Sequence, residues 1–177
     1  TRFPYESSWG GEESHTLTLA RYFRDKGYEV IFFGNCPVLI KKFIEEGFLV
    51  REVGGGRMIV TALELFKSFV LAPLWSSKLR RSFRELFVEY DVQALYCLSL
   101  NEKIFLTPEA LKNNIPVTWV EHQEIRNWLI KNPWKYLYKK YSKKVKIVPI
   151  SKKNERVLKM NLKVSKENIV EIVNGIN

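Results

Sequence analysis

The stretch "SSWGGEESHTLTLARYFRDKGYEV", residues 7–30, decides the fold of this chain. Two adjacent glycines stand directly before a run of apolar residues at helical spacing, and this run closes at Gly27. A glycine at that point is typical of the residue that ends a helix. The residues that follow, "EVIFFG", predict a buried strand. The stretch therefore predicts a loop, a helix and a strand, in that order.

The same alternation continues along the chain, with strands expected at 48–53, 92–98, 115–120, 146–150 and 168–173. Helices are expected at 38–47, at 59–70 with Pro73 as its stop, at 79–90, at 107–114 with Pro108 in its first turn, and at 152–160 with Ser151 as its cap. Strands that alternate with helices predict an α/β fold: a doubly wound, mainly parallel sheet with helices on both faces. The length of 177 residues predicts a single domain over 1–177.

The chain is basic, with a formal net charge of +10, which favours an anionic partner such as nucleic acid, a membrane surface or a phosphate-bearing substrate. Its two cysteines, Cys36 and Cys97, lack CxxC spacing. They indicate reduced thiols in the cytoplasm rather than a disulfide framework or a zinc site. The most apolar long stretch, 59–75, is too short and too polar to span a bilayer. No signal peptide is visible.

Gly10 and Gly11 head the first helix, where backbone N–H groups can approach an anion at the positive end of the helix. A tight turn without a ligand explains the pair equally well. Residues 1–5 are expected to be the end of a strand that precedes this loop, or the loop after it. Parallel sheets bind ligands at the carboxyl ends of their strands, so the loops after strands matter most.

Two other loops follow predicted strands. The glycines at 54–56 come close to a dinucleotide fingerprint, but Ile59 stands where its third glycine belongs, so we interpret them as a flexible loop. His122 stands just past the strand at 115–120, beside Glu121, where a histidine can reach a substrate. His15 lies in the first turns of a helix and is expected to pack or cap there.

Residues 125–154 hold ten Lys or Arg and no acid, with aromatic residues interleaved. One interpretation is a solvated basic helix with a packed aromatic stripe. The other is an interfacial helix on anionic lipid. In the second case the membrane-facing residues are Trp134, Lys135, Tyr138, Lys139 and Lys143. No RNP, KH or helix-turn-helix pattern supports nucleic acid.

In combination, five motifs resemble the N-terminal half of a family 4 (group 1) glycosyltransferase of the GT-B fold. They are "GGEESH" with "LARYFRDKGYEV", "IPVTWVEHQ", "IVPISKKNERVL" and "ENIVEIVNGIN". The first loop of that family reads Gly-Gly-x-Glu-x-His, which Gly10, Gly11, Glu13 and His15 match. A family strand ends in a histidine, matched by His122. The family closes on Asn-Gly-[Ile/Val]-Asp, which Asn174 begins here, with Asn177 where aspartate is usual.

The resemblance implies roles for particular residues. His122 is the catalytic candidate, lining the reaction centre against the transferred sugar or the acceptor. The donor- and acceptor-binding candidates are Gly10, Gly11, Glu13, His15, Glu121, Ser151 and Asn174. The family holds its nucleotide-sugar mostly through a second domain with a Glu-x7-Glu motif, and no two glutamates here have that spacing. The C-terminal donor-binding domain is therefore not expected within these 177 residues.

The sequence thus predicts the acceptor-side domain of an enzyme that moves a sugar from a nucleotide-sugar to an acceptor hydroxyl. The resemblance implies retention of configuration and no metal or other cofactor. The basic stretch suggests a lipid-linked acceptor and a cytoplasmic location, peripheral on the inner face of the membrane. Alternatives are a non-catalytic Rossmann-like module that binds an anionic surface or nucleic acid, a sugar-nucleotide epimerase, and an inverting GT-B relative. The domain alone is expected to be inactive.

Overall fold

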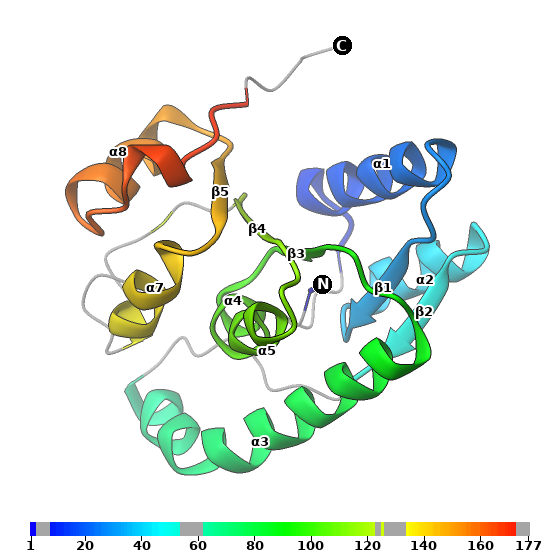
Figure 1. Cartoon of the computed structure of the whole chain (residues 1–177), viewed down its shortest axis with the longest axis horizontal. Helices are drawn as coiled ribbons and strands as arrows, with labels where there is room; N and C mark the ends of the chain where they lie inside the picture. The colour runs from blue at the N-terminus through cyan, green and yellow to red at the C-terminus, as the bar shows by residue number, and fades with distance from the viewer. Residues whose placement is uncertain (3–7, 54–61, 123–124, 126–133, 173–177) are drawn as a thin grey trace. The chain divides into compact units, whose positions relative to one another are not determined.

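Helices and parallel strands alternate along the chain in the computed structural model, which describes residues 1–2, 8–53, 62–122, 125 and 134–172, with only the backbone over 62–75 (Figure 1). The parallel sheets are flanked by helices, which confirms the expected α/β class. The chain divides into two compact units, Thr1–Leu79 and Arg80–Asn177, and each is described by itself. The single domain expected over 1–177 stays a prediction.

The first unit contains helix α1 (Gly11–Asp25), strand β1 (Ile31–Gly34), helix α2 (Pro37–Glu45) and strand β2 (Leu49–Glu52). β1 and β2 pair in parallel. Both helices end as their glycines predict: Gly27 and Gly47 have φ of +86° and +76°, which favours a residue without Cβ. The N–H groups of Tyr28 and Phe48 reach back to carbonyls five residues earlier and close the last turns.

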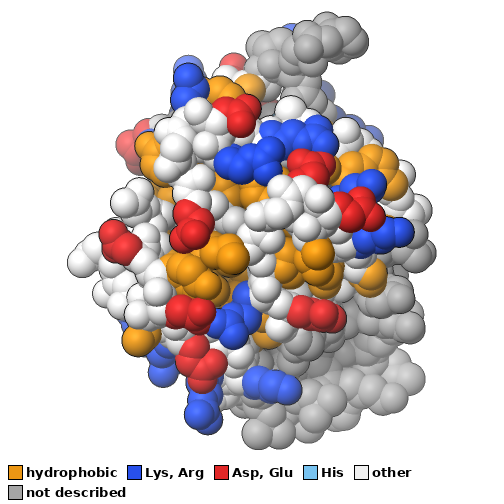
Figure 2. Space-filling view, turned by 90° about the vertical axis from the view of Figure 1, so that its right-hand side faces the viewer, with side chains coloured by type: hydrophobic (Ala, Val, Ile, Leu, Met, Phe, Trp, Pro, Cys, Tyr) orange, Lys and Arg blue, Asp and Glu red, His pale blue; other side chains and the backbone are white. Residues whose placement is uncertain are grey.

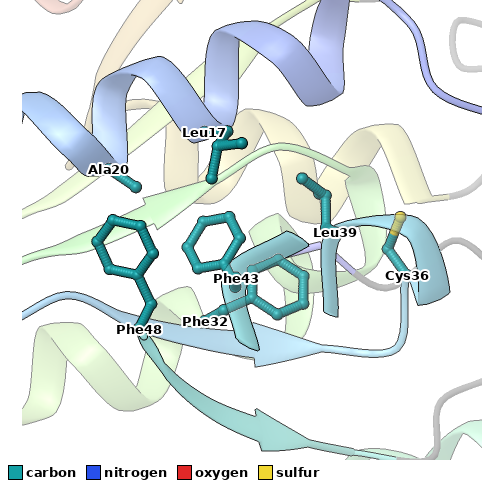
Figure 3. Close-up of a cluster of buried hydrophobic side chains, with 7 residues drawn as sticks. All are labelled: Leu17, Ala20, Phe32, Cys36, Leu39, Phe43 and Phe48. Atoms are coloured by element: carbon teal, nitrogen blue, oxygen red, sulfur yellow. The ribbon is translucent and has the colours of Figure 1, made fainter. Parts of the chain in front are cut away.

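Apolar side chains from α1, α2 and β1 meet in the core of this unit (Figure 3). Three phenylalanine rings pack in a row at a tilt, with centroids 4.9 Å apart for Phe32 and Phe43 and 5.0 Å apart for Phe43 and Phe48. The remaining members of the cluster are Leu17, Ala20, Cys36 and Leu39. This core explains the helical spacing in α1, because Leu17 and Ala20 lie on the face that packs against β1 and α2.

Arg2 lies beside β1, where it forms an isolated parallel bridge with Gly34. Its carbonyl also accepts a hydrogen bond from the Asn35 N–H at 3.1 Å. Residues 1–5 were expected to hold the end of a strand or the loop after it; Arg2 forms this single bridge, and residues 3–5 lie outside the described residues. The approach is so close that a Cβ on Gly34 would lie 2.0 Å from the Arg2 carbonyl oxygen, so only glycine fits there.

Helix α3 (Ala62–Glu89) runs for 28 residues and corrects two expectations. Pro73 lies inside it and does not end it, and the helix expected at 79–90 is its continuation. A proline within a helix costs about 3 kcal/mol through a lost hydrogen bond and a clash with a preceding carbonyl. The second half of α3 buries Leu79, Phe83 and Leu86, each contributing about 1.5–3 kcal/mol, which outweighs that cost.

The second unit contains strand β3 (Leu95–Cys97), helices α4 (Leu100–Phe105) and α5 (Thr107–Lys112), strand β4 (Val117–Glu121), helix α7 (Trp134–Ser142), strand β5 (Lys146–Pro149), helix α8 (Lys152–Met160) and the 3-10 helix η1 (Lys166–Asn168). Its sheet has the order β3-β4-β5, with both pairs parallel. Trp119 stands opposite Cys97 on one side and Ile147 on the other. β4 is therefore the middle strand.

Two elements of this unit differ from the expectation. The strand expected at 168–173 is reduced, in its described part, to an isolated bridge between Ile169 and Ile147. Val170 and Ile172 are exposed, so this segment lacks the burial that supports a strand. Helix α4 was not predicted. The signal was present, because Ser99 and Glu102 have the S-x-x-E spacing of a capping box, and the Glu102 carboxylate accepts from the Ser99 N–H at 2.7 Å.

Candidate active site

His122 directly follows β4, the middle strand of the second unit, and is half-buried. This is the position that the sequence predicts, just past the carboxyl end of a strand. Such loops are where ligands meet parallel sheets. That His122 faces the same cleft as Gly10 and Gly11 stays a prediction, because those glycines belong to the other unit.

The neighbouring Glu121 is the centre of a buried polar cluster. Its Oε1 atom accepts a hydrogen bond from the Tyr138 hydroxyl at 2.8 Å and pairs with Lys103 Nζ at 2.8 Å. Lys103 Nζ also donates to the Val120 carbonyl at 2.7 Å. The Glu121 carboxylate is thus engaged inside the chain, and its role in binding a donor or an acceptor stays a prediction.

The Tyr138 phenol is fully buried against the Trp119 ring, with centroids 4.8 Å apart. Burial first, and then the negative charge of Glu121, raise the pKa of Tyr138 well above its usual value. The phenol therefore keeps its proton and acts as a donor to Glu121 over the whole physiological pH range. Helices α4 and α7 consequently both hold the end of β4, through the same carboxylate oxygen of Glu121.

Asn154 ties α8 to the loop that carries His122. Its Nδ2 donates to the Glu121 carbonyl at 2.9 Å, and its Oδ1 accepts from the Ile125 N–H at 3.1 Å. Its own N–H donates to the hydroxyl of Ser151 at 3.1 Å, which confirms Ser151 as the cap of α8. A role of Ser151 in ligand binding stays a prediction.

The glycine loop lies at the start of α1, with Gly10 as N-cap and Gly11 as the first helical residue. Neither glycine has a positive φ, and a Cβ on Gly11 would meet no atom within 4 Å in the described part of the chain. A Cβ on Gly10 would lie 3.1 Å from Glu13 Oε2, so glycine at this position makes room for the carboxylate that caps the helix. Whether the glycine pair admits a ligand or only forms a turn stays open. His15 is exposed on α1, so it is not a packing residue.

Glu13 is buried and joins this loop to Arg2. One carboxylate oxygen accepts from the Gly10 N–H at 3.0 Å, and the other lies 2.9 Å from an Arg2 guanidinium nitrogen. Arg2 also pairs with Glu12. Burial opposes the charge on Arg2, but the hydrogen bond to Glu12 and the two carboxylate charges outweigh it and raise its pKa. Glu13 serves the fold in this way, and its role as a ligand group stays a prediction.

Two of the expected membrane-facing residues are buried, and this part of the prediction is wrong. Trp134 and Tyr138 are 8% and 1% exposed. They stand one helical turn apart and pack inward, Trp134 against Phe105 at 5.5 Å between ring centroids and Tyr138 against Trp119. The aromatic stripe of α7 is therefore core, as the alternative interpretation has it. Lys135 and Lys139 are half-buried and Lys143 is exposed.

On the face that Figure 2 displays, Lys and Arg side chains are interspersed with Asp and Glu side chains and with apolar ones. Such mixing is typical of a solvated surface rather than of a field of one sign. No helix in the described ranges is long and apolar enough to cross a membrane. Among those same residues, no three His, Cys, Asp or Glu side chains gather as metal ligands. The expectation that no metal is needed stays an expectation.

Several candidates lie outside the described residues, namely Asn174 and the glycines at 54–56. Conversely, Lys103, Asn154 and the inward role of Tyr138 were missed from the sequence. Asn154 lies three residues after the cap Ser151, a position that signals helix capping and not a contact to another strand. Lys103 lies in the short helix α4, which its capping box alone could have revealed.

Comparison with known proteins identifies a family that this chain matches. The model described as Glycosyltransferase Family 4 matches residues 9–177. No curated protein matches the chain. A glycosyltransferase from Rickettsia africae ESF-5 is similar in structure, with a TM-score of 0.67 and 20% identity over 95% of this chain and 40% of that one.

A second similar structure is Anabaena Alr3699/HepE in complex with UDP. Its TM-score is 0.70 at 12% identity, over 99% of this chain and 43% of that one. At these identities the similarity shows the fold. The chain spans 40% and 43% of the lengths of these two structures.

Proposed function

The chain belongs to glycosyltransferase family 4, and on that premise we propose that it is the N-terminal, acceptor-side domain of a GT-B enzyme that transfers a sugar from a nucleotide-sugar to an acceptor hydroxyl. The family and the similar structures support a role in glycosyl transfer and a Rossmann-like half of the GT-B fold. UDP is bound in the Anabaena structure, and this supports a nucleotide-sugar as the donor.

The observation that carries the proposal is the placement of His122. Its half-buried imidazole stands at the carboxyl end of the middle strand, where a parallel sheet presents groups to a ligand. An imidazole there can donate a hydrogen bond to a sugar or acceptor hydroxyl, or accept one from it. We assign His122 this contact with the transferred sugar or the acceptor.

In the proposed reaction the bond between the anomeric carbon and the diphosphate oxygen breaks, and the nucleoside diphosphate leaves with the electron pair. The acceptor oxygen forms the new bond to the anomeric carbon, and its proton passes to the departing diphosphate. Stabilisation of the leaving diphosphate is assigned mainly to a second domain, because the expected Glu-x7-Glu spacing does not occur in this chain. Gly10 and Gly11 are proposed to approach the phosphates or the acceptor from this side.

Two finer features are part of the proposal. We assign the transfer a retaining outcome, which the family resemblance suggests. We also propose a lipid-linked acceptor and peripheral attachment to the inner face of the membrane. The excess of basic residues over 125–154 supports the membrane attachment. Because Trp134 and Tyr138 are buried, this support comes from lysines such as Lys139 and Lys143 alone.

The test is a sugar-transfer assay with the protein that carries this chain. UDP-, GDP- and ADP-sugars are offered with and without free sugars or polyprenyl-diphosphate-linked sugars as acceptors, and release of the nucleoside diphosphate is measured. Release that depends on the acceptor is the expected result, and the anomeric configuration of the product, read by NMR, decides between retention and inversion. Anion or nucleic-acid binding without transfer of any sugar would instead establish the non-catalytic alternative. The 177-residue chain alone is expected to release nothing.

A further inference from the structure

We propose that Asn154, Lys103, Glu121 and Tyr138 form one positioning network that sets the place of His122. These residues touch no reacting atom in the proposal, so they are positioning residues rather than catalytic ones. The inference rests on the proposed function, because that function gives His122 its contact with the sugar or the acceptor.

Asn154 brackets the segment that contains His122. Through one carboxamide it holds the carbonyl of Glu121, which precedes His122, and the N–H of Ile125, which follows three residues after it. Asn154 is 1% exposed, so these bonds are shielded from bulk solvent. The two ends of the segment are therefore fixed relative to each other by a single rigid group.

The sheet alone holds this end of β4 weakly. Glu121 is the last paired residue of β4, and the ladder bond that its carbonyl oxygen accepts from the Ile150 N–H is long, at 3.5 Å. The Asn154 amide, at 2.9 Å, supplies the stronger donor. The peptide that precedes His122 thus depends on α8 for its orientation.

Lys103 and Tyr138 hold the same peptide from the other helices. Lys103 Nζ binds both the Val120 carbonyl at 2.7 Å and the Glu121 carboxylate at 2.8 Å, so backbone and side chain are tied together. The Tyr138 hydroxyl occupies the same carboxylate oxygen at 2.8 Å. Three helices, α4, α7 and α8, therefore converge on the two residues directly before His122.

Stability alone is a poor explanation for this arrangement. Removing a lysine and a glutamate from water is costly, and apolar residues of similar volume often serve a fold as well or better than a buried ion pair. Lys103 is 2% exposed and Glu121 is 8% exposed, so the pair carries this cost. Unlike apolar contacts, hydrogen bonds and ion pairs fix the orientation of the groups they join. Here they orient the peptide groups directly before His122.

The experiment uses the protein that carries this chain and follows the His122 imidazole by 1H–13C NMR with labelled histidine. The chain has two histidines, and the resonance lost in His122→Gln identifies the one of interest. Asn154→Ala and Tyr138→Phe are expected to shift the His122 resonance and leave that of His15 on α1 in place. The matched controls are Asn161→Ala, at an exposed asparagine on the end of α8, and Tyr136→Phe, at a tyrosine that is 68% exposed on α7.

Kinetics supply the second measurement. Displacing a catalytic group by about 1 Å lowers the rate far more than it lowers the affinity for substrate. Asn154→Ala is therefore expected to reduce kcat about 10- to 100-fold, with KM for the donor within about three-fold of wild type. Tyr138→Phe removes only a hydroxyl and keeps the ring packed on Trp119. If Asn154→Ala does not fold, the kcat of Tyr138→Phe therefore tests the positioning network.

The inference and the proposed function fail separately. An unmoved His122 resonance with kcat within about two-fold of wild type in Tyr138→Phe would overturn the network and leave the transferase assignment intact. Absence of any sugar transfer by wild type would remove the proposed function, while a shift of the His122 resonance would still establish that the network positions this side chain.

Discussion

The Glu13 carboxylate accepts a hydrogen bond from the N–H of Gly10 at 3.0 Å and thereby closes the first turn of α1. Its other oxygen faces the buried Arg2 at 2.9 Å. The glycine loop is therefore held by a side chain on its own helix and by a residue that pairs with β1. The glutamate of the Gly-Gly-x-Glu-x-His motif has a structural task that its place in the motif does not reveal.

Glu13→Ala should lower the free energy of unfolding by about 1–2 kcal/mol, because a capped N–H loses its partner and Arg2 loses one of its two carboxylates. Glu13→Gln keeps an acceptor for Gly10 and removes only the charge, so a smaller loss is expected. Urea unfolding measures both. Equal losses in the two variants would show that the cap contributes nothing beyond the charge.

Alanine at Gly34 and Gly11 should give opposite results. At Gly34 the new Cβ would meet the Arg2 backbone at 2.0 Å, and a loss of about 1–3 kcal/mol is expected. At Gly11 a Cβ meets nothing in the described residues, and alanine should gain at most about 0.5 kcal/mol because this is the first residue of the helix. If the bare backbone admits a ligand, Gly11→Ala should nevertheless lower sugar transfer. Undiminished transfer in that variant would return the glycine pair to a plain turn.

His122→Ala should reduce kcat of the protein that carries this chain by about 100-fold or more, a magnitude typical of a lost transition-state contact. Because His122 is half-buried at a strand end, its loss should change the melting temperature little. A matched control is Asn168→Ala, another half-buried polar side chain in the same unit. A fall in stability that accounts for the whole fall in activity would argue against a catalytic contact.

Glu102 predicts a pH dependence of stability. Burial raises the pKa of this fully buried carboxyl above its usual value, against the lowering effect of its hydrogen bond from the Ser99 N–H and of Lys103. Above the ordinary pKa, the native state then binds more protons than the unfolded state, so stability falls as pH rises through that window. Glu102→Gln should remove this slope and raise stability at neutral pH.

The difference between Glu102→Gln and wild type, measured by urea unfolding from about pH 4 to pH 8, isolates this carboxyl from the other groups that titrate there. Glu85→Gln is the control, since the Glu85 side chain is 60% exposed on α3. A difference that does not grow with pH would contradict the raised pKa.

The lysines of α7 and the loop after it give a prediction for membranes. Each basic residue near an anionic bilayer contributes about 1 kcal/mol, so Lys135→Glu, Lys139→Glu and Lys143→Glu together should abolish co-sedimentation with phosphatidylglycerol vesicles. Added salt should weaken wild-type binding, because the Debye length is only about 10 Å at 0.1 M. The control is Lys26→Glu, Lys41→Glu and Lys42→Glu together, which changes the net charge equally and should leave vesicle binding in place. Equal recovery of wild type with anionic and neutral vesicles would leave the stretch a solvated face.

The sequence by itself determined most of the alternation of helices and strands, and that His122 directly follows a strand. Gly27 ends a helix because its positive φ favours a residue without Cβ, and Ser151 begins one because its hydroxyl accepts from a backbone N–H. These are interactions between residues a few positions apart. The apolar run before His122 likewise identified a buried strand, so the histidine had to stand at its end.

Only the tertiary structure decided which polar groups meet and which faces are turned inward. Tyr138 and Lys103 reach Glu121 across 17 and 18 residues of chain, and the spacing of α7 is compatible with either a packed or an exposed aromatic stripe. Pro73 lies within α3 because burial of the residues after it outweighs a local cost. Local rules describe what each segment tolerates, whereas the burial of a side chain depends on neighbours that only the folded chain brings to it.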